Sequence, residues 1–211
     1  MTQKTKTILF TDIKSSSILW KTHGVQKMVK ILDAHDVRVR EFAEEFQGTI
    51  IKTSGDSYMI VFPKWQDAFQ FCLEFQYNEY HHPLYIGKDT LKIRIGFCHG
   101  KVIEKHVLLQ EQQMVDYFGT MVNKASRLES GVSDVGHFAF GFDKQLSKEP
   151  VFPESDIEYS VSIEEFSDTC TPNENVKNSR RLFNARQHHC HAEGTLKGVG
   201  EVLAYKINIH F

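Results

Sequence analysis

The stretch Thr7–Lys21, TILFTDIKSSSILWK, decides how the fold of this chain is interpreted. A short apolar run typical of a buried strand reaches one carboxylate, Asp12, before a serine-rich turn leads into a second apolar run. A carboxylate at the end of a core strand, followed by backbone amides that open a helix, can hold a cation beside a phosphate. On its own the pattern is also typical of a helix cap, so other motifs must decide.

The composition predicts a globular protein of one domain, residues 1–211, because this length is enough for a full core. Hydrophobic residues make up 41% of the chain and charged residues 25%, which argues against a disordered chain. The formal net charge of −2 provides no general attraction to nucleic acid or to anionic membranes. No window is apolar for long enough to span a bilayer, so we expect a cytoplasmic protein with no nucleic-acid or membrane partner.

The cysteines are widely spaced and form no CxxC pair, which favours a reducing compartment and argues against a disulfide framework or a zinc knuckle. They are Cys72, Cys98, Cys170 and Cys190. The tract His188 to His191 resembles a metal-binding sequence. Adjacent residues do not easily point at one ion, so we interpret this tract as part of a polar loop.

Hydrophobic periodicity predicts strands and helices that alternate along the chain. The expected strands are Thr7–Ile13, Thr49–Lys52, Tyr58–Phe62, Leu91–Cys98 with an end at Gly100, His137–Gly141 and Val202–Ile209. The expected helices are Ser16–Phe46 with a bend at Gly24, Trp65–Tyr80 and Gly119–Ser130. A loop is expected over His81–Thr90, a ribbon and turn over Lys101–Met114, and an insertion of loops with one short hairpin or helix at about 147–193. This order predicts an α+β sandwich with helices on one face.

Two aspartates form the first candidate site. Asp12 follows the first strand, and Asp56 lies at the tip of the hairpin in KTSGDSYMIVF (52–62). If these strands are neighbours, both carboxylates reach one edge of the sheet, where hard oxygen ligands describe a magnesium site. Turn and cap chemistry explains the same residues, so their spacing alone leaves both interpretations open.

A second group of polar residues lies later in the chain. Asn123 and Arg127 are one helical turn apart, so a carboxamide and a guanidinium share one face and can position a ribose and a phosphoryl group. Lys52 and Asp116 offer a donor and an acceptor, which is how a base edge is read. Without further context, solvated surface positions explain each of these side chains better than a binding site does.

Five motifs together resemble the catalytic domain of the class III nucleotidyl cyclases, in the same order and at roughly the same spacing. They are FTDIKSSS (10–17), KTSGDSYMIVF (52–62), IRIGFCHGKV (93–102), DYFGTMVNKASRLES (116–130) and LKGVGEVLAYKI (196–207). The resemblance covers Thr7 to about Gly141 and then Thr195 to Ile209. It implies a ferredoxin-like βαββαβ class III cyclase sandwich with an extra insertion before the last strand.

The resemblance implies the metal-binding and catalytic residues. Asp12 and Asp56 match the two metal-binding aspartates, with the Ile13 carbonyl as a further ligand. Asn123 matches the asparagine that orients the ribose, and Arg127 matches the arginine that stabilises the transition state. The implied cofactors are two divalent cations, Mg²⁺ or Mn²⁺.

The resemblance also implies how a nucleoside triphosphate is bound. Main-chain amides from Ile13 through Ser15, Ser16 and Ser17 would cradle the triphosphate, Arg94 and Lys197 match phosphate-binding residues, and Lys52 and Asp116 match the pair that reads adenine. The two cations would lower the pKa of the ribose 3′ hydroxyl for in-line attack on the α-phosphorus, with pyrophosphate leaving. Sites of this family form between subunits, which implies a head-to-tail homodimer with shared active sites.

Two departures from the family accompany the resemblance. The run Ser15 to Ser17 replaces the usual Gly-Ser/Thr, so the phosphate turn lacks its glycine. The insertion at about 147–193 has no counterpart.

Three alternatives stay open. ATP conversion to cyclic AMP is the first expectation, because guanylate cyclases typically carry Glu and a small residue at the two base-reading positions. Small cyclases of bacterial anti-phage signalling use CTP or UTP instead and make cCMP or cUMP. A catalytically inert nucleotide-binding dimerisation module is the non-enzyme alternative.

Overall fold

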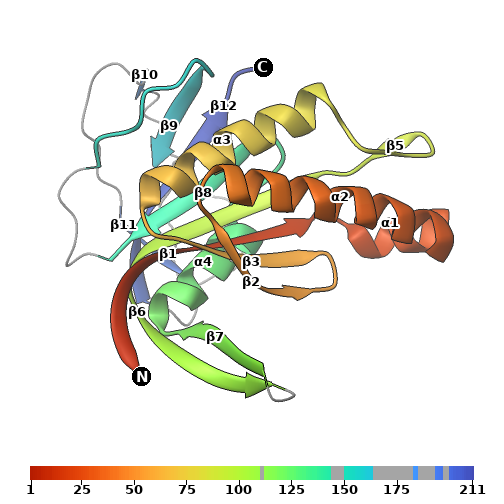
Figure 1. The fold of residues 1–211 in the computed structure, drawn as a ribbon. Helices are drawn as coiled ribbons and strands as arrows, with labels where there is room; N and C mark the ends of the chain where they lie inside the picture. The colour runs from red at the N-terminus through yellow and green to blue at the C-terminus, as the bar shows by residue number, and fades with distance from the viewer. Residues whose placement is uncertain (110–111, 144–149, 164–182, 185–192, 197–199) are drawn as a thin grey trace.

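The computed structural model of the chain describes residues 1–109, 112–143, 150–163, 183–184, 193–196 and 200–211. Within these residues, one large sheet carries helices on its faces, and Figure 1 shows their arrangement. The helices are α1 (Ser16–His23), α2 (Val25–Glu45), α3 (Trp65–His81) and α4 (Thr120–Gly131). The strands of the large sheet are β1 (Thr2–Ile13), β2 (Thr49–Ser54), β3 (Ser57–Phe62), β6 (Ile93–Leu109), β7 (Gln112–Phe118), β8 (His137–Phe142), β9 (Tyr159–Ile163), β10 (Phe183–Asn184), β11 (Glu193–Leu196) and β12 (Gly200–Ile209).

The strand order confirms the predicted ferredoxin-like βαββαβ sandwich. The chain runs β1, α1–α2, β2, β3, α3, β6, and these four strands lie in the order β6-β1-β3-β2. β1 is therefore central and pairs antiparallel with both β3 and β6. Beyond β6 the sheet continues through β8, which is parallel to β6, and then through β12 and β9.

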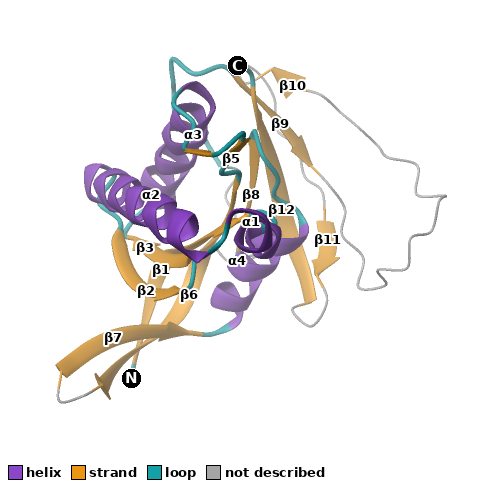
Figure 2. Ribbon diagram, turned by 90° about the vertical axis from the view of Figure 1, so that its right-hand side faces the viewer, coloured by secondary structure: helices purple, strands orange, loops and turns teal. Residues whose placement is uncertain are grey.

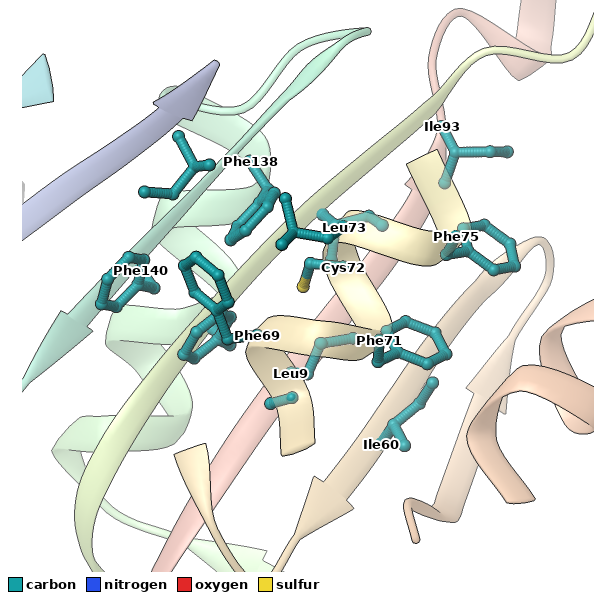
Figure 3. Packing of buried hydrophobic residues seen from close by; sticks show 14 of the residues in the cluster. Leu9, Ile60, Phe69, Phe71, Cys72, Leu73, Phe75, Ile93, Phe138 and Phe140 are labelled. Carbon is teal, nitrogen blue, oxygen red and sulfur yellow. The ribbon is translucent and has the colours of Figure 1, made fainter. Parts of the chain in front are cut away.

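The two faces of the sheet are both buried, so the expectation of helices on one face was wrong. Figure 2 shows α2 and α3 on the same side of the sheet. On that side Phe69, Phe71 and Phe75 of α3 pack over the strands, as the close view in Figure 3 shows. On the other side α4 contributes Met121 and Leu128 to a second apolar cluster.

The reason for two-sided burial lies in the central strand. Successive side chains of a strand point to opposite faces, so neighbours in β1 enter different cores. Leu9 belongs to the cluster under α2 and α3, whereas Ile8 belongs to the cluster under α4, and both are fully buried. An unbroken apolar run such as TILF is typical of a strand covered on both faces.

Several of the expected helices and strands are confirmed. The bend at Gly24 is present, because this residue has φ 76° and separates α1 from α2. The aromatic side chains of β8 belong to the core as the alternation of Phe138, Phe140 and Phe142 indicated. The expected loop over His81–Thr90 contains a small hairpin, β4 (Tyr85–Ile86) with β5 (Asp89–Thr90).

The expected end of a strand at Gly100 was wrong. β6 continues to Leu109, pairs with β1 as far as Glu104 and forms a long ribbon with β7. Figures 1 and 2 both show this ribbon projecting from the body of the molecule. A Cβ at Gly100 would lie 2.8 Å from the sulfur of Met121, so the glycine serves close packing of α4 and not a turn.

Part of the segment expected to be an insertion belongs to the sheet. β9 pairs with β12, and Tyr159 and Val161 are buried. The tract His188 to His191, Cys170 and most of the range 147–193 lie outside the described residues. No helix in the described part of the chain is long and apolar enough to cross a membrane.

Candidate functional site

Asp12 lies at the end of β1, where strand pairing determines its neighbours. Its cross-strand partner in β6 is Arg94, and the Arg94 Nη2 atom donates a hydrogen bond to Asp12 Oδ2 at 2.5 Å. The other carboxylate oxygen, Oδ1, accepts a hydrogen bond from the hydroxyl of Ser57 at 2.7 Å. Both contacts follow from β1 lying between β3 and β6, so the carboxylate is oriented by its two neighbouring strands.

Asp56 lies beside Asp12 because the β2–β3 turn meets the end of β1. Burial raises the pKa of Asp56, the hydrogen bond from Ser16 lowers it, and the nearby charges of Asp12 and Arg94 raise and lower it respectively. Its Oδ2 atom is buried and accepts no hydrogen bond within the described residues. The structure therefore brings the two predicted metal-binding carboxylates together and leaves one oxygen unpaired.

Arg94 joins this carboxylate pair to helix α4. Its Nε atom lies 3.1 Å from Glu129 Oε1, while its Nη2 atom contacts Asp12. Burial raises the pKa of Glu129 to about 7, an effect that Arg94 opposes and Asp12 adds to. One guanidinium thus lies between two carboxylates that come from different elements.

The turn after Asp12 leads into the N-terminus of α1. Ser15 precedes the helix with φ 59° and ψ 29°, a left-handed conformation that a glycine adopts at lower cost. None of the side chains in the described part of the chain caps the helix, and the first amides of a helix have no acceptor within it. The amides of Ser16 and Ser17 consequently point away from the helix, as the predicted phosphate cradle requires.

The predicted base-reading pair is formed within the chain. Lys52 of β2 donates to both carboxylate oxygens of Asp116 in β7, at 2.9 and 3.0 Å. Asp116 also accepts a hydrogen bond from the amide of Tyr117 at 2.8 Å, which fixes the carboxylate at the entry to α4. The pair is partly exposed, so both groups can exchange their mutual contact for a ligand.

Asn123 and Arg127 share the exposed face of α4. The opposite face carries Leu128 and Glu129, which are buried against the sheet. Since residues 127 and 129 differ by about 200° around a helix axis, Arg127 points away from the side on which Glu129 reaches Arg94. Within one chain, the structure does not bring Arg127 to the carboxylate pair.

Two residues of the site were missed in the sequence. Ser57 orients Asp12, and Glu129 holds Arg94. Both lie inside the motifs SGDS and NKASRLES, and the helical period alone would have placed Glu129 on the face opposite to Arg127. Lys197, which was predicted to contact phosphate, lies outside the described residues.

A close contact between backbones brings α4 to this site. A Cβ atom at Gly96 of β6 would lie 2.2 Å from the amide nitrogen of Glu129, so only glycine permits this approach. The hydroxyl of Ser133, just beyond the helix, donates to the carbonyl oxygens of Ile95 and Leu128. The end of α4 is therefore fastened to β6 beside Arg94.

Comparison with known proteins identifies the family. The family model of the adenylate and guanylate cyclase catalytic domain matches residues 2–136. An adenylate cyclase of Podospora anserina is 30% identical over 154 residues, which cover 64% of this chain and 7% of that protein. The chain thus corresponds to a small part of the curated relatives that it matches.

Solved structures share the fold. The guanylate cyclase domain of a rhodopsin–guanylyl cyclase from Catenaria anguillulae, solved in complex with GTP, has a TM-score of 0.69 at 17% identity, with full coverage of both chains. A non-canonical dimeric guanylyl cyclase domain from Blastocladiella emersonii has a TM-score of 0.65 at 17% identity, again with full coverage of both. At these identities the likeness extends to the fold alone.

Proposed function

The chain belongs to the adenylate and guanylate cyclase catalytic domain family. We therefore propose that it converts a nucleoside triphosphate to a 3′,5′-cyclic nucleotide and pyrophosphate, with ATP as the substrate and cyclic AMP as the product. The observation that carries the proposal is the meeting of Asp12 and Asp56 beside the unpaired amides at the start of α1. This arrangement places two hard anionic ligands next to a cradle for phosphate. The whole chain acts in this proposal as a single catalytic domain with an insertion at about 147–193.

The donor set fits two divalent cations, Mg²⁺ or Mn²⁺. Asp56 Oδ2 is buried without a hydrogen-bond partner in the described residues, which costs free energy unless a cation is bound. Asp12, Asp56 and the carbonyl of Ile13 would hold the cations, since such ions prefer oxygen ligands. When bound, the cations lower the pKa of the ribose 3′ hydroxyl and offset the charge of the triphosphate.

Backbone amides and side chains of the protein bind the substrate and stabilise the transition state. The amides of Ser15, Ser16 and Ser17 bind the triphosphate, and Arg94 and Lys197 contact its oxygens. Asn123 orients the ribose for in-line attack on the α-phosphorus. Arg127 stabilises the charge that develops on the phosphoryl group as pyrophosphate leaves.

The catalytic site is shared between two copies of the chain in a head-to-tail homodimer. The support for this is the geometry of α4, whose Arg127 points to solvent while its opposite face packs against β6. A second copy would bring its own Asn123 and Arg127 to the carboxylate pair of the first. Closed two-fold symmetry then produces two equivalent sites.

ATP is the proposed substrate because of the pair Lys52 and Asp116. A cationic donor and an acidic acceptor complement the N1 and 6-amino edge of adenine. Their mutual contact at 2.9 Å keeps both charges compensated in the absence of nucleotide.

The test is incubation of the purified protein with Mn²⁺ and, separately, ATP, GTP, CTP and UTP, with cyclic products separated by chromatography. Dominant formation of cyclic AMP is expected. Lys52→Ala should lower kcat/KM for ATP about tenfold, since a hydrogen bond to a charged donor is lost. Thr53→Ala, on the same exposed strand, is the matched control and should leave the preference unchanged.

Two other results would replace the proposal. Dominant turnover of CTP or UTP would assign the chain to pyrimidine cyclases such as those of bacterial anti-phage signalling. Nucleotide binding with no product from any of the four substrates would make it an inert dimerisation module.

A further inference from the structure

Arg94 contacts one of the two carboxylates that the proposed function assigns to the cations. Its Nη2 atom lies 2.5 Å from Oδ2 of Asp12, while Oδ1 of the same carboxylate accepts a hydrogen bond from Ser57. Arg94 and a bound cation would compete for the Asp12 carboxylate, because a guanidinium and a divalent cation close together repel each other. The Arg94 contact must therefore weaken or break when a cation is bound.

Glu129 is the acidic group that remains next to Arg94. Its Oε1 atom lies 3.1 Å from Arg94 Nε, on the side of the guanidinium that does not contact Asp12. The Glu129 side chain is largely buried, with 9% of its surface exposed, so its interaction with Arg94 is only weakly screened by solvent. Arg94 can accordingly leave Asp12 without becoming an unpaired charge.

The backbone of Glu129 is held in place while the side chain of Arg94 is long and rotatable. Gly96 lets the backbone of α4 approach β6 so closely that a Cβ would lie 2.2 Å from the Glu129 nitrogen. Ser133 fastens the following turn to Ile95 and Leu128. Any rearrangement on cation binding is therefore expected in the side chains of Arg94 and Glu129, and not in the backbone that carries Glu129.

We propose that Glu129 is a positioning residue that holds the Arg94 guanidinium when Asp12 binds a divalent cation. The inference rests on the proposed function in one respect, which is the cation at Asp12. Held by Glu129, Arg94 stays at the site with its Nη atoms available to an incoming triphosphate. Glu129 acts through Arg94 rather than as a ligand, since the described residues contain no group of three His, Cys, Asp or Glu side chains arranged to hold a metal.

The test measures Mn²⁺ binding to the full chain in the absence of nucleotide. The electron paramagnetic resonance signal of free Mn²⁺ reports how much of the ion is unbound. Glu129→Gln should weaken Mn²⁺ binding about tenfold, because Arg94 then has no charged partner other than Asp12. Arg94→Ala should strengthen Mn²⁺ binding, because the competing charge is gone. A general loss of structure would not change the affinity in opposite directions.

The matched control is Glu79→Gln. Glu79 is another buried carboxylate with an arginine partner, Arg38, at 2.6 Å, and it belongs to α3 rather than to the site. This variant should bind Mn²⁺ as the wild type does. Thermal unfolding of each variant identifies those that are folded at the temperature of the measurement.

The double variant shows whether Glu129 acts by pairing with Arg94 or only by adding negative charge near the cation. In the Arg94→Ala background, Glu129→Gln should change the Mn²⁺ affinity by less than about twofold. An equal weakening in both backgrounds would overturn the inference, as would a Glu129→Gln variant that binds Mn²⁺ like the wild type.

Failure of the inference is distinguishable from failure of the proposed function. If Asp12→Asn leaves Mn²⁺ binding unchanged, the cation is elsewhere and the inference is overturned. If the Mn²⁺ results are as expected but none of the four nucleotides yields a cyclic product, the inference stands and the proposed activity fails.

Discussion

The two halves of the candidate site differ in how the fold holds them. Asp12 and Arg94 lie at strand ends and contact each other, Asp56 lies in the β2–β3 turn close enough for their charges to affect its pKa, and all three residues are partly buried. Asn123 and Arg127 lie on a solvent-facing side of α4. The first half, which we call the metal half, is arranged by strand pairing within one chain, whereas the second, the α4 half, is exposed to solvent in the described part of that chain.

This difference indicates which groups of the site must be held together within one chain and which can come from another chain. Charged groups that must stay close in the absence of ligand are compensated locally, as Arg94 compensates Asp12 and Glu129. Groups whose partner arrives from outside can stay hydrated at little cost. The contrast leads to the expectation that the halves fail independently and can be supplied by different chains.

The largest expected effect concerns complementation between chains. Asp12→Ala and Arg127→Ala should each lower cyclase activity by at least about 100-fold, and a mixture should regain about a quarter of the wild-type rate, because half of the dimers are mixed and each holds one intact site. The measurement is cyclic nucleotide formation after mixing and re-equilibration.

The control for complementation pairs two defects in the same half. A mixture of Asp12→Ala with Asp56→Ala should stay inactive, since every site then lacks one carboxylate. Recovery of cyclase activity in this control, or no recovery in the first mixture, would show that the site is not divided into these two halves.

The next largest effect separates chemistry from cation binding. Arg127→Ala should lower kcat by about 10²- to 10³-fold, the usual cost of removing a donor that stabilises the transition state. Its Mn²⁺ affinity should equal that of the wild type, whereas Asp56→Ala should lose Mn²⁺ binding. Equal Mn²⁺ loss in both variants would mean that the halves are not distinct.

A third effect concerns a buried histidine beneath the metal half. His35 of α2 is fully buried between Tyr58 and Phe75, with ring centroids 5.7 and 6.2 Å away. Burial, and to a smaller extent the charge of Arg38, lowers the pKa of His35 from 6.5 to about 4, while the charge of Asp36 opposes the shift. Since the folded state resists protonation, stability is full above pH 6.5 and is lost as the pH falls toward 4.

His35→Leu should therefore remove about 3 kcal/mol of the stability loss between pH 6.5 and pH 4. Urea unfolding at a series of pH values measures the difference. His82→Leu, at an exposed position, serves as the control and should follow the wild-type curve. Parallel curves for wild type and His35→Leu would show that the histidine does not contribute to acid unfolding.

The smallest expected effect is on stability and concerns the turn between Asp12 and helix α1. Ser15 has φ 59°, so Ser15→Gly should raise the free energy of unfolding by up to about 1 kcal/mol. Ser17, in the first turn of α1, has no such strain, and Ser17→Gly should lower it by about 0.5–1 kcal/mol. Thermal unfolding measures both, and two changes of the same sign would argue against strain at Ser15.

Much of the fold could be predicted because the signals are local. The apolar run in β1 and the three- and four-residue steps in α2 and α3 depend only on residues that are close in the sequence. The strand end expected at Gly100 was wrong for a physical reason. Its missing side chain accommodates Met121 of α4, and no local pattern distinguishes that role from a turn.

The sequence predicted which candidate residues lie near one another, but not all of the contacts that they make. Asp12 and Asp56 lie together as expected, and Lys52 reaches Asp116 across a separation of 64 residues. The positions of Ser57 and Glu129 at the site were missed, because neither residue type in isolation indicates a site. Only the pairing of β1 with β3 and the approach of α4 to Gly96 bring these two side chains into contact with the site.

By itself, the sequence determined the order of the helices and strands, the apolar character of both faces of β1, and the motifs that the family shares. Tertiary structure alone decided that α4 covers the second face, that Arg94 lies between Asp12 and Glu129, and that Arg127 faces solvent. The physical reason is the separation along the chain over which each kind of interaction acts. Periodicity acts over a few residues, whereas these contacts depend on strand register and on how closely two backbones can approach.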